Sequence, residues 1–201
     1  MTKEEWDRSE DAHDMLIFLW KQRGFTLRWP DVRFGGNVQQ SDAEVAADND
    51  FSRSLHRFYL ESCRSIWKLL PQEESRRGVE LAERFLAGAA TAEEVNEYNW
   101  HVEAAAFCID YDSAPEDIAR WVAEVRALPV ADLRAIVYPP EAADEVEPRE
   151  LLMQAAYFVD YAMIYPSLRP QGPPPASYRV FLSAKLLRRH VGYPEQLGRK
   201  A

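Results

Sequence analysis

The sequence predicts an all-α fold in which residues 1–201 form one domain, a multi-helix bundle of about eight or nine helices. Apolar residues recur at steps of three and four along most of the chain, which is the period of helices with one buried face. Capping-box pairs and proline or glycine stops bound these segments, and no convincing sheet is found. A chain of 201 residues that is 47% apolar and 12% aromatic can bury a sizeable core. Stacked helical pairs are an alternative arrangement of the same helices.

The stretch 51–70 has the longest unbroken helical period, and we expect it to be the central helix of the bundle. Asp50 or Ser52 can cap its start, and Pro71 is expected to end it because proline lacks a donor and clashes with the preceding turn. A stripe this wide needs partner helices on at least two sides. Its large apolar residues are Phe51, Leu55, Phe58, Tyr59, Ile66, Leu69 and Leu70.

The N-terminal segment is predicted to hold two helices followed by a long loop. Thr2 and Glu5 form a capping-box pair, so a short first helix is expected to carry Trp6. A second helix is expected from about residue 11 to residue 23, where the period fits. Residues 24–50 contain Pro30, paired glycines and an acidic polar run, which predict a loop, with a short hairpin around Pro30 as an option. Such a long loop is uncommon in a compact domain unless it is mobile or functional.

The rest of the chain alternates between helical patterns and turn signals. Thr91 and Glu94 form a second capping box that opens a helix. The proline-rich stretch 165–177 is predicted to be an extended connector, and the last helix, over residues 178–190, is expected to lead into a frayed tail. The helices expected between these landmarks cover residues 72–87, 91–110, 113–128, 131–138 and 149–164.

The net charge of −9 is unevenly distributed along the chain. Residues 91–160 contain 4 basic and 16 acidic residues, a balance of 4 − 16 = −12, whereas residues 161–201 give 7 − 1 = +6. We expect the acidic middle and the basic tail to complement each other, within one fold or between subunits. An acidic middle argues against broad nucleic-acid binding, although the tail alone can contact an anion.

Several features indicate a soluble protein of the cytoplasm. The longest apolar run covers only residues 15–20, far too few to span a membrane. The acidic N-terminus has no hydrophobic signal region. Cys63 and Cys108 are the only cysteines, and their apolar, helical surroundings predict buried free thiols in a reducing compartment.

Two groups of polar residues could hold a metal ion or act as acid and base. Glu94, Glu97 and His101 lie at i, i+3 and i+7 on one helical face, and such a set can bind metal inside a bundle. Di-iron bundles use Glu-x-x-His, which does not occur here, so a solvated acidic face is the preferred interpretation. Asp110 and Asp112 flank Tyr111 and could serve Mg²⁺ or acid–base work, but aspartates at a helix end also serve as caps.

Repeated histidine–cysteine spacing raises the option of a zinc site. The pairs His56–Cys63 and His101–Cys108 are each seven residues apart. Seven residues span about 10 Å of helix, so one helix can hardly place both side chains on one ion. Ordinary histidines and buried thiols are therefore the preferred interpretation.

Basic and aromatic groups near the C-terminal end could act as binding surfaces. Arg188, Arg189 and His190 could bind an acidic surface or phosphate, but a solvated helix face or pairing with the acidic middle is preferred. The tyrosines near the proline-rich connector could line a peptide groove or fold the connector onto the body, which we prefer. These tyrosines are Tyr157, Tyr161, Tyr165 and Tyr178.

Four stretches of the N-terminal half carry a resemblance: TKEEWDRSED, MLIFLWKQRG, RFYLESCRSIWKLL and SRRGVELAERFLAGAATAEE. Through them residues 1–110 resemble a group of uncharacterised bacterial proteins that occur as large paralogous sets, chiefly in planctomycete-type genomes. Residues 24–50 look like an insertion in this pattern, and residues 111–201 match weakly. Because the group has no assigned activity, the resemblance implies a helical module used with different partners and carries over no catalytic residue.

Three observations bear on function: no set of polar residues converges, the charge is uneven, and the N-terminal half resembles a group without assigned activity. Together they predict a non-enzymatic α-helical module that binds protein and uses no cofactor. The alternative is a metal-dependent or hydrolytic enzyme with a carboxylate–histidine site between helices, built from the polar groups described above. A third hypothesis is nucleic-acid binding through the basic tail.

Overall fold

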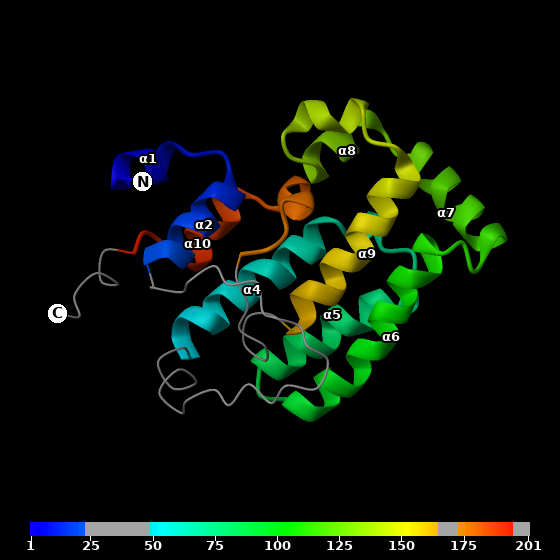
Figure 1. Ribbon diagram of the computed structural model, residues 1–201, viewed down its shortest axis with the longest axis horizontal. Coiled ribbons are helices and arrows are strands. Elements are labelled where there is room, and N and C mark those ends of the chain that lie inside the picture. The colour runs from blue at the N-terminus through cyan, green and yellow to red at the C-terminus, as the bar shows by residue number, and fades with distance from the viewer. Residues whose placement is uncertain (23–48, 165–172, 195–201) are drawn as a thin grey trace.

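The computed structural model describes residues 1–22, 49–164 and 173–194, which contain nine α-helices and three short 3-10 helices (Figure 1). Within these ranges the one β-type pairing is an isolated bridge between Asp11 and Ser183. The all-α prediction is therefore confirmed. The elements are α1 (Lys3–Arg8), α2 (Ala12–Gln22), α4 (Asn49–Ser65), η1 (Trp67–Leu69), α5 (Glu73–Leu86), α6 (Ala92–Asp110), α7 (Pro115–Arg126), α8 (Val130–Ile136), η2 (Pro140–Asp144), α9 (Pro148–Ile164), η3 (Ala176–Phe181) and α10 (Ala184–His190).

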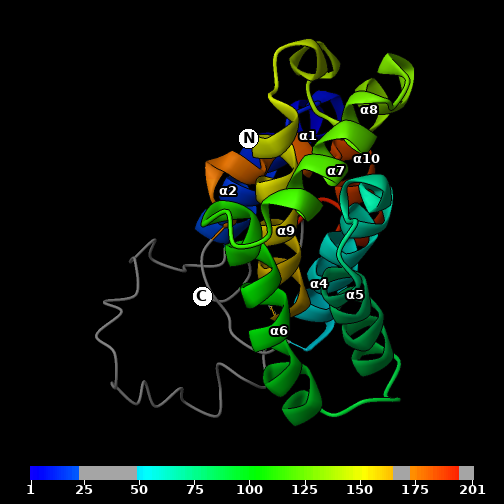
Figure 2. The ribbon, with the colours of Figure 1, turned by 90° about the vertical axis from the view of Figure 1, so that its right-hand side faces the viewer.

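Helix α9 lies at the centre of the bundle, where it contacts α4, α5, α6 and α7 (Figures 1 and 2). Of its 17 residues, ten are buried, which is more than a single face can supply. It therefore needs neighbours on several sides. The segment 51–70, expected to be central, provides one of those neighbours through α4.

The expected helix over residues 51–70 is broken near its end. Helix α4 stops at Ser65, and the chain continues as the 3-10 helix η1. The hydroxyl of Ser62 donates to the backbone oxygen of Phe58 at 2.9 Å, and that of Ser65 donates to the oxygen of Ser62 at 2.7 Å. Such side-chain bonds compete with the helical ladder, and Ile66 leaves the helical region with φ −97° and ψ 17°. Ser52 lies inside α4 and is buried, so it is not the cap.

Helices α5, α6 and α9 meet closely at Gly78. A Cβ atom at this position would lie 2.5 Å from Cγ2 of Val102 on α6 and 3.2 Å from Sδ of Met163 on α9. Packed side chains do not approach that closely, so the absence of a side chain lets the three helices meet here.

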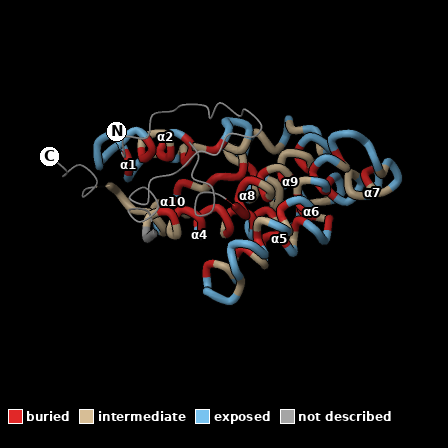
Figure 3. Tube along the Cα trace, turned by 60° about the horizontal axis from the view of Figure 1, so that its bottom comes forward, coloured by how far each residue is buried: buried red, intermediate tan, exposed pale blue. Residues whose placement is uncertain are grey.

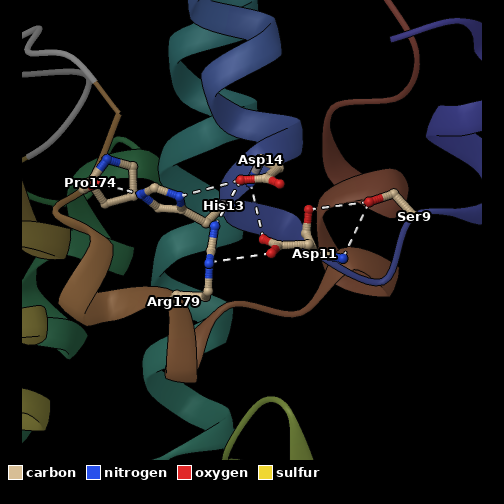
Figure 4. Close-up of polar contacts among 6 residues, drawn as sticks. All are labelled: Ser9, Asp11, His13, Asp14, Pro174 and Arg179. Carbon is tan, nitrogen blue, oxygen red and sulfur yellow. Dashed lines mark hydrogen bonds and ion pairs between the residues drawn. The ribbon is translucent and has the colours of Figure 1, made fainter.

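The first and last described segments pack together beside α4 (Figure 1). Arg179 of η3 pairs with Asp11 and Asp14 at the start of α2, at 3.2 and 2.7 Å (Figure 4). Nε2 of His13 donates to the backbone oxygen of Pro174 at 3.0 Å, across 161 positions of sequence. We call these five residues the terminal clasp. Because a carbonyl only accepts, this contact places the proton of neutral His13 on Nε2.

The predicted helix over residues 178–190 is two elements, η3 and α10, separated by Leu182 and Ser183. Ser183 has extended backbone, bridges to Asp11 and caps α10 by accepting the N–H of Leu186. Ala176, predicted to belong to the extended connector, starts η3 instead. Residues 165–172 of that connector and 195–201 of the expected tail lie outside the described residues, as do residues 24–48 of the predicted loop. Asn49, assigned to that loop, begins α4.

Residues 173–194 of the basic C-terminal segment pair with the N-terminal helices and α4, and not with the acidic middle as expected within one fold; the basic residues at 169, 199 and 200 lie outside the described residues. Arg188 donates to the backbone oxygens of Trp6 and Ser9 at 3.1 and 2.7 Å, and Arg189 pairs with Glu61. Within the described residues, 173–194 form no ion pair with 91–160. The segment 1–52 is itself acidic, with 6 − 11 = −5, which explains this choice of partner.

Helices α7 and α8 and the 3-10 helix η2 form the outer part of the bundle, and the chain after α8 meets η3, where the N–H of Tyr138 donates to the oxygen of Val180 at 2.8 Å. Helix α7 packs on α9, and η2 packs on α8. Figure 3 shows buried residues along the inner helices and exposed ones on outer turns, for example around α7. Among the residues that the structure describes, no helix combines the length and the apolar character that crossing a membrane would require.

Candidate functional site

The predicted metal candidates Glu94, Glu97 and His101 all lie on α6 but do not converge. The Glu94 carboxylate accepts the backbone N–H of Thr91 at 2.6 Å, and this hydrogen bond lowers the pKa of Glu94. The ring of His101 instead lies against Tyr98, with centroids 5.1 Å apart. In the described part of the chain, no group of three or more His, Cys, Asp or Glu side chains could hold a metal ion.

Asp110 and Asp112 connect the end of α6 to α9. Asp110 accepts the hydroxyl of Tyr157 at 2.7 Å. Asp112 has φ 55°, a left-handed conformation that aspartate tolerates at a helix end, and pairs with Arg149 at 3.2 Å. Each carboxylate thus has its own partner on α9, so the two do not form the shared acid–base pair that the sequence raised as an option.

The two histidine–cysteine pairs end up in different surroundings. His56 and Cys63 are buried on α4, and burial raises the pKa of the Cys63 thiol. Its thiolate is therefore disfavoured, which removes the form that binds zinc or attacks a substrate. His101 and the half-buried Cys108 line an open groove on α6.

The basic and tyrosine groups near the C-terminal end serve internal contacts. Glu61 of α4 pairs with Arg189 and with His190, whose Nε2 lies 2.5 Å from the carboxylate. The Tyr178 hydroxyl donates to the backbone oxygen of Tyr157, and its ring lies 5.7 Å from that of Tyr161. These described tyrosines fold residues after the connector onto α9. Tyr165 lies outside the described residues.

A cleft of about 410 Å³ lies between α4, α5 and α10. Two of its carboxylates are already engaged, because Arg64 pairs with Glu83 at 2.5 Å and Glu61 is bound by Arg189 and His190. The ring of Trp67 lies 4.1 Å below the Arg64 guanidinium and fixes it further. Arg57 also lines the cleft.

The outward side of α6 carries large aromatic residues that the sequence interpretation overlooked. Trp100 and Tyr111 are 72% and 73% exposed, and Phe107 is 39% exposed. With Ala104 they lie at steps of four, three and four, so they form one stripe. We call these four residues the α6 outer face. The available signal was the presence of apolar residues on two opposite sides of this helix, because one side of a helix is enough to face a core.

Ring contacts order one end of this face. Phe107 packs edge-on against Tyr111 and Tyr157, with centroids 5.7 and 5.9 Å apart. Burial, and then the hydrogen bond to Asp110, raise the pKa of Tyr157, so its hydroxyl stays protonated and donates. The aromatic stripe is therefore supported from α9.

An open groove of about 460 Å³ lies directly beside the α6 outer face. It runs between the start of α5, the side of α6 and helix α7, and Ala104 belongs to both groove and face. Gln72 ties α5 to α6 here, because its Nε2 donates to the oxygen of Ala105 at 2.7 Å. We call it the α5–α7 groove. Its lining includes the apolar residues Ala105, Cys108 and Trp121 and the carboxylates of Glu73, Glu74 and Asp117.

Carboxylates outnumber basic groups around this surface. Helix α6 contains no lysine or arginine, and its acidic residues include Glu93, Glu97 and Glu103 on the outward half. In the groove, Asp117 is paired with Arg120 at 2.7 Å and Glu73 with Arg77 at 3.8 Å. The excess of carboxylates therefore lies on α6, beside the aromatic stripe.

A scan against models of protein families, a search of curated proteins and a search of solved structures each found no match for the chain. The resemblance of residues 1–110 stays a prediction, and the function has to be argued from the α6 outer face and the α5–α7 groove themselves.

Proposed function

We propose that this protein is a helical protein-interaction module that binds its partner on the α6 outer face. The observation that carries the proposal is the exposure of Trp100 and Tyr111 on one stripe with Phe107. Single exposed apolar residues are normal, but a contiguous aromatic patch with a charged border is typical of interaction sites. Tryptophan and tyrosine are also the residues that most often supply binding energy in interfaces.

The enzyme hypothesis has no comparable support. Among the carboxylates that would serve it, Glu94 takes part in a helix cap, and Asp110 and Asp112 are partners of Tyr157 and Arg149. Nucleic-acid binding through the tail is likewise disfavoured, because Arg179, Arg188 and Arg189 are engaged with acidic side chains or backbone oxygens.

Site-specific photo-crosslinking tests the proposal. A photoreactive residue at position 100, in cells that naturally make the protein, should give a defined crosslinked partner, whereas one at Val130, also exposed but on α8, should not. The partner is then purified and recombined with Trp100→Ala/Tyr111→Ala and with the control Val130→Ala. We expect at least about tenfold weaker binding for the first variant only, the loss typical of interface anchors.

Equal binding by the double variant and the wild type would overturn the proposal. Misfolding is excluded as a cause by urea unfolding, because exposed side chains should change the free energy of unfolding by no more than about 0.5 kcal/mol.

A further inference from the structure

We infer that the partner presents a basic amphipathic helix, which lies along α6 and inserts an apolar side chain into the α5–α7 groove. The inference rests on the proposed function, because it specifies the partner of the same surface. It follows from the charge, the length and the shape of this surface.

Charge selects a cationic partner. Glu93, Glu97 and Glu103 border the aromatic stripe, and no lysine or arginine of α6 offsets them. An opposite charge on the partner is favoured, and a like charge directly across the interface is penalised. Glu74 extends the same sign into the groove, where the neighbouring Glu73 is paired with Arg77 at 3.8 Å.

Charge also argues against a second copy of this chain on the same face. In a twofold dimer through α6, each carboxylate border would meet an identical border. Near the C-terminal end, Arg179 and Arg189 are already paired with Asp14 and Glu61, and Arg188 is bound to backbone oxygens of Trp6 and Ser9. A distinct cationic protein fits the surface better.

The length and the shape of this surface favour a partner that presents a helix. Trp100 and Tyr111 are eleven positions apart, which is about 16 Å along α6, or about three turns of a partner helix. A helix places anchors at i, i+3, i+4 and i+7, which suits a straight stripe. The groove lies beside the stripe and shares Ala104 with it, so one anchor can contact Trp100 while a neighbouring one enters the groove.

Three labelled peptides of about 18 residues, long enough to become helical when bound, test this by fluorescence anisotropy. The first has leucine at i, i+3, i+4 and i+7 and lysine elsewhere, the second replaces lysine by glutamate, and the third scrambles the first. We expect the first to bind at least about tenfold more tightly than the other two, with affinity falling as salt rises.

Matched variants assign the binding to this surface. Trp100→Ala should weaken the lysine peptide at least about tenfold, as expected for an anchor. Glu97→Lys/Glu103→Lys should weaken it further and improve binding of the glutamate peptide. The control Glu141→Lys/Glu145→Lys makes the same change in net charge on exposed residues around η2 and should have little effect.

Equal binding of the scrambled peptide, or equal loss in the control variant, would overturn the inference, because either result indicates charge attraction without a shaped site. Self-association that disappears in Trp100→Ala would also overturn it and assign the face to a second copy. If the crosslinked partner needs Trp100 but neither helical peptide binds, the inference fails while the proposed function stands.

Discussion

Gly78 shows how one missing side chain sets the distance between three helices. Gly78→Ala should lower the free energy of unfolding by about 1–3 kcal/mol through overpacking against Val102 and Met163. This loss should appear even though alanine has the better helix propensity, by about 1 kcal/mol. Urea unfolding measures it. Adding Val102→Ala, which removes the nearest atom, should make the Gly78 substitution less costly, and a Gly78→Ala protein more stable than the wild type would contradict the close packing.

Because His56 is buried, we expect the protein to lose stability in mild acid. This histidine is buried on α4, and desolvation lowers its pKa to about 4 from the ordinary value of 6.5. The unfolded chain takes up a proton near pH 6.5 while the folded chain does not, so the free energy of unfolding falls as the pH drops from about 6.5 to 4. The total is on the order of 3 kcal/mol.

Urea unfolding at pH 7 and pH 5 checks this expectation. His56→Gln should reduce the difference between the two pH values, whereas His101→Gln, at an exposed histidine, should leave it unchanged. Equal pH dependence in wild type and His56→Gln would show that other groups dominate.

Among the helices, starts marked by a capping box were easier to predict than breaks within an apolar period. The capping boxes at Thr2 and Thr91 were predicted from the sequence and are present, because the motif satisfies local donors whatever the tertiary context. The break after Ser65 and the interruption at Ser183 were missed. At both places serine hydroxyls bond to backbone atoms three or four residues away, which the apolar period does not reveal because it continues across them. At Ser183 the bridge to Asp11 adds a contact that the fold sets.

The capping box of α6 gives a direct test of this local control. Thr91→Ala removes the acceptor for the Glu94 N–H, 3.1 Å away, and should cost about 1 kcal/mol of unfolding free energy. Thr91→Ser keeps an acceptor and should lose much less. Thermal or urea unfolding of the pair measures the difference, and equal losses in the two variants would mean that the hydroxyl is not what matters.

The candidate site could not be predicted from the apolar period of one helix. Val95, Val102 and Ile109, at steps of seven along α6, are buried as a helical apolar period predicts. That period could not decide whether another helix covers Trp100 and Tyr111, because that depends on how α5, α7 and α9 are arranged. For the same reason the groove, formed by elements distant in sequence, was not predictable.

At the scale of the whole molecule, Arg188 connects the last described helix to the first turns of the chain. Arg188→Ala removes two bonds from a charged donor to the oxygens of Trp6 and Ser9, at a cost of about 1–3 kcal/mol. Hydrogen exchange should show faster exchange of amides in α1 and α2. Lys185→Ala, an exposed change on the same helix, is the control and should leave these amides protected.

The packing of the first described segment against the last one also has a consequence for synthesis. A ribosome makes Trp6 and Phe18 long before Tyr193, whose ring lies 6.0 and 6.2 Å from theirs. Until Tyr193 has emerged these two rings lack this cover, and the nascent chain carries an exposed apolar segment. A stalled or prematurely released product would therefore be a favoured substrate for chaperones that hold exposed apolar segments.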